Sequence, residues 1–217
     1  VLYGVYGIWD TEHMNQQADS SQYKTYKPSS SDYESFEDLV KQNPEVFGWL
    51  TIEGTNIDYP LLQADNNSKY VNTDVYGNFS LSGSIFLDYK NEKNFTDMNN
   101  IVYGHHMQKG KMFGQLDQFE DKEYFENHKT GKLFFNDQWH EVEFFAFLCT
   151  DAYDDMIYDT LLQWETDGQR YLEYIQNKAI NYREISSGEK TFLTLSTCNS
   201  DSTNGRYILI GYIKDNR

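Results

Sequence analysis

A cysteine near the carboxyl end of the chain has the surroundings of a reactive thiol. The β-rich run 191–198 ends at Cys198, and after a polar, glycine-containing stretch the chain resumes as the apolar run 206–213, which begins with Arg206. This pattern predicts an antiparallel hairpin in which Cys198 and Arg206 lie close together beside the loop. Because a fixed positive charge near a cysteine favours the thiolate, the hairpin predicts a nucleophile.

Side-chain alternation along the first strand of this hairpin indicates where the thiol points. Leu193 and Leu195 share one face of the strand, whereas Thr194, Ser196 and Cys198 share the other. The sulfur is therefore expected on a polar, surface-directed face, although an unpaired cysteine is more commonly a small buried hydrophobe.

A thiol nucleophile usually needs an imidazole for proton transfer. His105 and His106 follow the strand-like run 100–104, which ends at a glycine, whereas the other three histidines lie in polar, surface-like contexts. Alternation places the two neighbours on opposite faces, so only one of them can reach the thiol from a strand.

These segments together resemble the sortases, the cysteine transpeptidases of Gram-positive bacteria. The sequence TLSTC at 194–198 is similar to the family's Thr-Leu-x-Thr-Cys motif, which carries the nucleophile. Tyr-Gly-His at 103–105 and Gly-Arg at 205–206 are similar to the two other catalytic elements, in the family's order. The segments 43–60 and 83–88 resemble class B sortases in particular.

The resemblance implies a role for each candidate residue. Cys198 would be the nucleophile and Arg206 the donor to the oxyanion. His105 would be the acid and base, because the family's histidine directly follows the glycine. The hydroxyl residues of the cysteine motif are weaker candidates for substrate binding, since hydroxyls in strands commonly only fill the pleat: Thr194, Ser196 and Thr197.

The implied reaction is covalent acyl transfer without a metal or cofactor. The thiolate would cleave a sorting signal of the Asn-Pro-x-Thr or a similar x-Pro-x-Thr type and form a thioacyl enzyme. An amine of a peptidoglycan precursor would then take the acyl group, anchoring a surface protein to the cell wall. The net charge of −16 argues against nucleic acid as a partner. Two alternatives stay open: another cell-wall cysteine acyl transferase or protease, and a non-enzymatic exported binding domain.

The hydrophobic pattern predicts a mainly β protein of the α+β class. A short amphipathic helix is expected over 31–42 and a long helix over about 159–180. The expected strands lie near 48–52, 57–62, 84–88, 100–105, 131–136, 139–150, 191–198 and 206–213. The resemblance implies that residues 31–217 form one catalytic domain, a sortase-type eight-stranded β-barrel whose long helix precedes the cysteine strand.

The first thirty residues are predicted to lie outside this domain. Residues 1–9 are apolar and aromatic but too few to span a bilayer. The resemblance implies that they are the outer end of a truncated, single amino-terminal membrane anchor, on the extracellular face of the membrane. A docked strand or a disordered tail is an equal alternative. Residues 10–30 are polar and are expected to form a flexible stalk.

The second cysteine, Cys149, closes the aromatic strand-like run 144–149. Two cysteines in an extracellular protein invite a disulfide. A nucleophile must be able to attack, however, and a thiol inside an aromatic strand is ordinary. We therefore expect two thiols that are not bridged.

Overall fold

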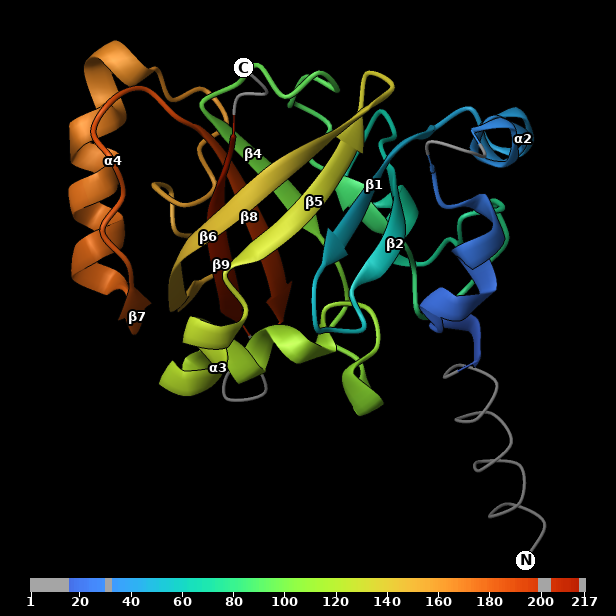
Figure 1. Ribbon diagram of the computed structural model, residues 1–217, viewed down its shortest axis with the longest axis horizontal. Helices are drawn as coiled ribbons and strands as arrows, with labels where there is room; N and C mark the ends of the chain where they lie inside the picture. Colours follow the sequence, from blue (N-terminus) through green and yellow to red (C-terminus); the bar gives the residue numbers. More distant parts are fainter. Residues whose placement is uncertain (1–15, 30–32, 199–203, 215–217) are drawn as a thin grey trace, which may run out of the picture.

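The computed structural model describes residues 16–29, 33–198 and 204–214, and strands dominate it (Figure 1). The strands are β1 Val46–Ile52, β2 Asp58–Leu62, β3 Ile85–Leu87, β4 Asn99–Tyr103, β5 Thr130–Phe135, β6 Gln138–Asp151, β7 Asn181–Tyr182, β8 Thr191–Cys198 and β9 Gly205–Ile213. They pair in the order β5-β1-β2-β3-β4-β8-β9-β6-β7, and β5 also pairs with β6. The last pairing closes eight strands into a barrel and leaves β7 outside it.

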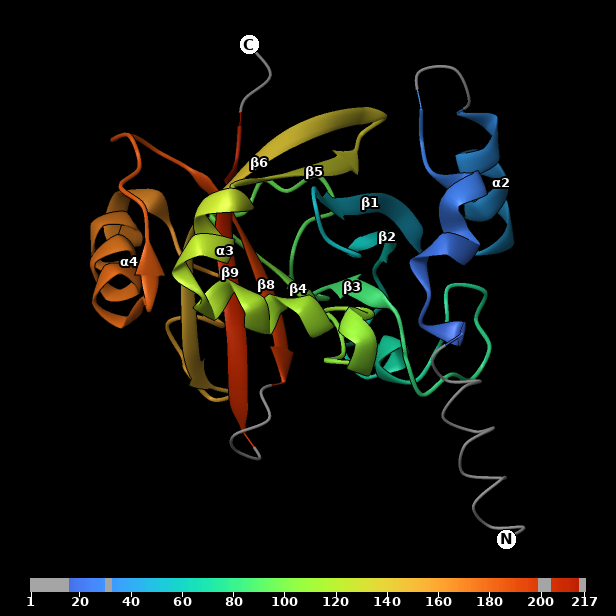
Figure 2. The same ribbon diagram turned by 60° about the horizontal axis from the view of Figure 1, so that its bottom comes forward.

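Helices cover the sides and one end of this barrel. They are α2 Glu34–Gln42, α3 Lys122–Asn127 and α4 Trp164–Lys178, with the 3₁₀ turns η1 Ser20–Tyr26, η2 Lys69–Val71, η3 Gln108–Gly110 and η4 Gly114–Glu120. Figure 2 shows α4 on one side of the barrel and α2 with η1 on the opposite side. The segment from η4 to α3 crosses one end and contributes Leu116, Phe119 and Phe125 to the barrel core.

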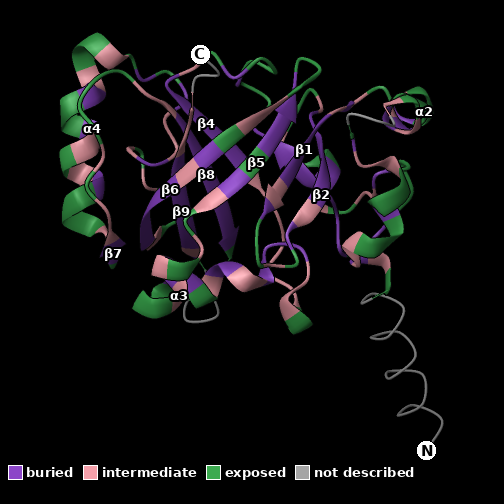
Figure 3. Cartoon of the chain, viewed as in Figure 1, coloured by how far each residue is buried: buried purple, intermediate pink, exposed green. Residues whose placement is uncertain are grey.

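Two apolar cores stabilise the fold, one inside the barrel and one under α4. Leu193 and Leu195 of β8 belong to the barrel core, whereas Phe192 of the same strand packs in the other core with Tyr171 and Ile175 of α4. The strands are accordingly buried over most of their length, while the outer face of α4 is exposed (Figure 3). Strand β8 is therefore covered on both of its faces.

The predicted mainly β barrel, with its amino-terminal helix and its long helix before the cysteine strand, is confirmed. All eight predicted strands are present, and both helices are shorter than expected by a few residues at their ends. The pattern missed β7, α3 and the 3₁₀ turns. Elements of two to seven residues are too short to show a hydrophobic period of their own.

The amino-terminal segment 16–29 packs on the barrel. Ala18 and Tyr23 are buried and belong to the same apolar cluster as the barrel interior, and Lys27 forms an ion pair with Asp58 at 2.8 Å. The flexible stalk expected over 10–30 therefore does not describe this part of the chain. Residues 1–9, the expected anchor end, lie outside the described residues. Within the described ranges, no helix combines the length and the apolar character that crossing a membrane requires.

Candidate active site

The predicted hairpin is formed by β8 and β9, and it sets the cysteine beside the arginine. The two strands pair antiparallel from Thr191 opposite Ile213 to Cys198 opposite Arg206. Cys198 is exposed, whereas Arg206 is half-buried and donates from Nη1 to the Gly205 carbonyl at 2.9 Å. A guanidinium has five N–H donors, so this bond leaves others to face the cavity beside the thiol.

The parallel pairing of β4 with β8 brings His105 close to Cys198 and Arg206. Strand β4 runs parallel to β8, with Tyr103 level with Ser196, and the Gly104 N–H donates to the Ser196 carbonyl at 3.2 Å. His105 follows two residues after Tyr103, just beyond the end of β4, and Cys198 follows two residues after Ser196 at the end of β8. Both line one cavity, so the structure brings together the three residues predicted to carry catalysis.

The His105 ring is oriented by a backbone carbonyl. Its Nε2 lies 2.7 Å from the oxygen of Val71, the last residue of η2. An acceptor at this distance binds a protonated Nε2, which holds the ring in one orientation. His106 faces elsewhere, with its Nε2 3.0 Å from an Asp117 carboxylate oxygen.

The shared cavity has a volume of about 390 Å³. It is lined by backbone and side-chain atoms of η2, β3, β4, β8 and β9, together with the connections beside them. The lining residues are Asn67, Val71, Ser84, Phe86, Tyr103, Gly104, His105, Ser196, Thr197, Cys198 and Arg206.

Two of the three predicted substrate-binding hydroxyl residues, Ser196 and Thr197, lie at this cavity, and Thr194 does not. Thr194 is fully buried and donates to Asn99 Oδ1 at 2.8 Å. Alternation assigned it correctly to the face opposite the leucines, but this face is covered by the core under α4. The expectation of a surface-directed polar face was therefore wrong for Thr194, and Ser196 is only 2% exposed.

Tyr103 and Asn67 line the cavity beside β4, and both contact Asp88, which lies outside the lining. The Tyr103 hydroxyl and Asn67 Nδ2 both donate to Asp88 Oδ2, at 2.9 and 2.7 Å. Tyr158 stacks on Tyr103 and shares a 2.8 Å hydrogen bond with the Ser196 hydroxyl. Burial raises the pKa of Tyr158 to about 12, so its hydroxyl stays protonated at neutral pH.

Sequence reasoning missed Asn67, Asp88 and Tyr158. Each lies in or next to a connection rather than in a patterned element, and of the three only Asp88 belongs to a segment, 83–88, that resembles the family. Burial also raises the pKa of Tyr103, assisted by the adjacent Asp88. Two sequence signals pointed to this part of the site: the position of Tyr103 two residues before His105, and the place of Asp88 at the end of the segment 83–88.

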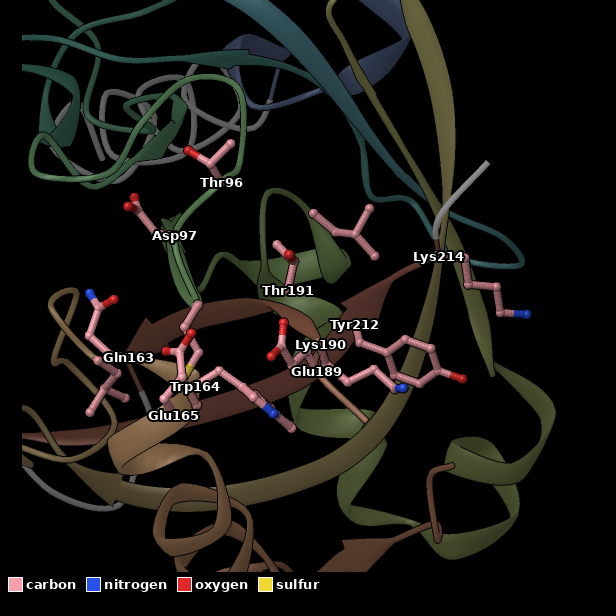
Figure 4. A pocket seen from close by; sticks show the side chains of 13 residues that line it. Thr96, Asp97, Gln163, Trp164, Glu165, Glu189, Lys190, Thr191, Tyr212 and Lys214 are labelled. Atoms are coloured by element: carbon pink, nitrogen blue, oxygen red, sulfur yellow. The ribbon is translucent and has the colours of Figure 1, made fainter. Parts of the chain in front are cut away.

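A larger cavity, of about 780 Å³, lies at the opposite end of β8 (Figure 4). Its walls come from the start of α4, the start of β8 and the end of β9, and they include Trp164, Lys190 and Tyr212. Cys198 stands at the other end of β8, so this cavity does not contain the thiol. We therefore take the smaller cavity as the candidate active site, because Cys198, His105 and Arg206 line it.

Neither Cys149 nor Cys198 forms a disulfide, as predicted. Cys149 lies opposite Tyr207 in the pairing of β6 with β9 and is half-buried. Over the described part of the chain, no group of histidine, cysteine and carboxylate side chains has the arrangement of a metal site.

Comparisons with known proteins agree on one family. A model of the sortase domain matches residues 50–214. Sortase B of Listeria monocytogenes is 36% identical over 177 residues, which are 80% of this chain and 72% of that protein. Among solved structures, a Streptococcus pyogenes class B sortase involved in pilus biogenesis is 39% identical, with a TM-score of 0.75, over 82% of this chain and 97% of that one. The Staphylococcus aureus sortase B–substrate complex is 25% identical, with a TM-score of 0.78, over 100% of both chains.

Proposed function

The chain belongs to the sortase family and resembles its class B members, and on that premise we propose that Cys198, His105 and Arg206 carry out its cell-wall transpeptidase reaction. The observation that carries this proposal is the common cavity, which the thiol, the imidazole and the guanidinium line together. Sortases act at the cell surface, and the substrates proposed here are the sorting signal of a surface protein and an amine of a peptidoglycan precursor.

In the proposed first step, the Cys198 thiolate attacks the carbonyl carbon of the scissile peptide bond. The carbon–nitrogen bond then breaks, and His105 as the imidazolium gives its proton to the departing amine. A thioester on Cys198 and a neutral imidazole result. The Val71 carbonyl supports this exchange, because it holds the ring in a fixed orientation while the proton moves.

The thioester is resolved when an amine attacks it. His105, now neutral, takes the proton from the attacking nitrogen, the carbon–sulfur bond breaks, and the thiolate is regenerated. No net proton is gained or lost by the enzyme over the cycle. With a peptidoglycan amine as the acceptor, the product is a protein joined covalently to the cell wall.

Arg206 is proposed to stabilise the oxyanion that forms on the carbonyl oxygen in both steps. Its place opposite Cys198 in the strand pairing supports this role, because a charged group with several donors would then lie beside the carbon under attack. A charged donor is effective here because the oxyanion exists only beyond the ground state. Ser196 and Thr197 are proposed to contact the bound peptide from the same edge of the cavity.

We predict that Arg206→Lys loses nearly as much activity as Arg206→Ala. Lysine keeps the positive charge but not the planar fork of donors, so an oxyanion role requires the arginine. The loss is expected mainly in kcat and should amount to about 100-fold, the effect of about 3 kcal/mol of transition-state stabilisation. Steady-state cleavage of a sorting peptide by both variants measures it. A near-normal kcat in the lysine variant would instead make Arg206 a general electrostatic partner of the thiolate.

A ligation assay tests the proposed function against its alternatives. The protein is incubated with an Asn-Pro-x-Thr-type peptide and a free amine, and the products are separated by mass. A ligated product is expected. Hydrolysis without ligation would favour another cysteine hydrolase of the cell wall, and an unchanged peptide would favour a non-enzymatic binding domain. A Leu-Pro-x-Thr-type peptide in parallel compares the two classes of signal.

The organisation of the chain is part of the proposal. Residues 31–217 are assigned to the catalytic domain, and the docked segment 16–29 is added to it because Ala18 and Tyr23 share its core. Residues 1–9 are proposed to be the outer end of an amino-terminal anchor at the extracellular face of the membrane. The apolar and aromatic sequence of these residues supports that assignment.

A further inference from the structure

The loop that carries His105 is closed by its own far end. The Phe113 N–H donates to the His105 carbonyl at 2.9 Å, and His106 pairs with Met112 in an isolated β-bridge. These contacts join the two sides of the loop between β4 and η4. The position of His105 therefore depends on how Met112 and Phe113 are held.

Met112 has a backbone conformation that needs support from outside the loop. Its φ of +52° lies in the left-handed region, which residues other than glycine rarely adopt. Its N–H is buried and donates to the Tyr59 hydroxyl at 2.9 Å. That hydroxyl donates in turn to the Ala18 carbonyl at 2.8 Å. A two-bond relay thus links the amino-terminal segment, through β2, to the histidine loop.

An ion pair forms a second link between the same two parts. Lys111 Nζ lies 2.5 Å from Asp19 Oδ2, and the lysine side chain is largely buried. Asp19 also caps η1, because its Oδ1 accepts from the Ser21 N–H at 2.9 Å. The bond from Lys111 lowers the pKa of Asp19 to about 2, so the carboxylate is charged throughout the neutral range.

We propose that Tyr59 and Asp19 are positioning residues that couple the docked segment 16–29 to the placement of His105. This inference rests on the catalytic role proposed for His105. Neither residue lines the cavity, so each acts through its partner in the loop, Tyr59 through Met112 and Asp19 through Lys111. The hairpin of β8 and β9 makes none of these contacts. Loss of the coupling is therefore expected to slow proton transfer and to leave peptide binding largely unchanged.

Two substitutions remove the links with little other change. Tyr59→Phe deletes the hydroxyl and keeps the ring, and Asp19→Asn removes the charge while leaving an oxygen that can cap η1. Each is expected to lower kcat about tenfold and to change KM less than about twofold, because small displacements of a catalytic group are costly. Both variants are first checked by circular dichroism and thermal unfolding.

Matched controls come from elsewhere in the fold. Tyr124→Phe removes a buried hydroxyl that has no hydrogen-bond partner within the described residues. Asp38→Asn removes the carboxylate of an exposed pair with Lys41 on α2. Among the described residues, no hydrogen bond, ion pair or ring contact joins either side chain to the loop between β4 and η4. Both variants are expected to keep kcat within about twofold of the wild type.

Histidine-ring NMR gives a readout that needs no turnover. In protein labelled at its histidine side chains, the His105 resonances are identified by their loss in His105→Gln. They are expected to shift or broaden in Tyr59→Phe and Asp19→Asn, and to stay unchanged in the two controls. If the His105 resonances shift in these two variants but the wild-type protein ligates no sorting peptide, the coupling is supported and only the proposed function is contradicted. Unmoved His105 resonances in both variants, or an equal kcat loss in Tyr124→Phe, would overturn the coupling.

Discussion

Replacement of Cys198 by alanine is expected to abolish both cleavage and transfer of a sorting peptide. Without the sulfur no thioester can form, and the cavity holds no second thiol. The fold should persist, because Cys198 is exposed and the change in unfolding free energy should stay within about 0.5 kcal/mol. Product formation by mass spectrometry and thermal unfolding measure the two effects.

Cys149→Ser is the matched control for this loss. Cys149 lies on β6 and does not line the cavity, so most of the activity should survive. A full loss in Cys149→Ser with little effect of Cys198→Ala would reverse the roles assigned to the two thiols.

His105→Ala is expected to lose most of its activity, and His106→Ala only a little. General acid–base catalysis contributes about 100- to 10,000-fold, so removal of the proposed proton carrier should lower kcat by that order. His106 does not line the cavity; its ring bonds Asp117 and lies 6.0 Å from the ring of Tyr207. Loss of this partly exposed pair should cost about 1 kcal/mol of stability or less.

Parallel steady-state kinetics of the two alanine variants check this prediction. His105→Gln is a useful third variant, since its amide fills part of the space of the ring but transfers no proton. A severe loss in His106→Ala beside near-normal turnover in His105→Ala would contradict both the assignment of the histidine and the strand register.

The proximity of Cys198 and Arg206 could be predicted from sequence, because it depends only on two strands that are adjacent in the chain. Cys198 ends one strand and Arg206 is the second residue of the next, so hairpin geometry alone brings them close together. His105 is different. Its approach to Cys198 requires the parallel pairing of β4 with β8, which joins residues far apart in the chain, and only the resemblance to a family indicated it.

The errors have an equally physical origin. Thr194 looked surface-directed because alternation separates two faces and cannot tell which of them another element covers. Helix α4 and the residues around it cover that face, and the Thr194 hydroxyl bonds Asn99. The polar segment 16–29 looked like a stalk, although a few buried groups, including Ala18 and Tyr23, are enough to dock it.

The most direct test of the proposed mechanism is the covalent intermediate itself. The wild-type enzyme is mixed with a sorting peptide in the absence of an acceptor amine, quenched in acid, digested and analysed by mass spectrometry. An acyl group equal in mass to the amino-terminal part of the cleaved peptide is expected as a thioester on Cys198. It should disappear when an amine is added before the quench. An adduct on Cys149, or cleavage that proceeds in Cys198→Ala, would contradict the mechanism.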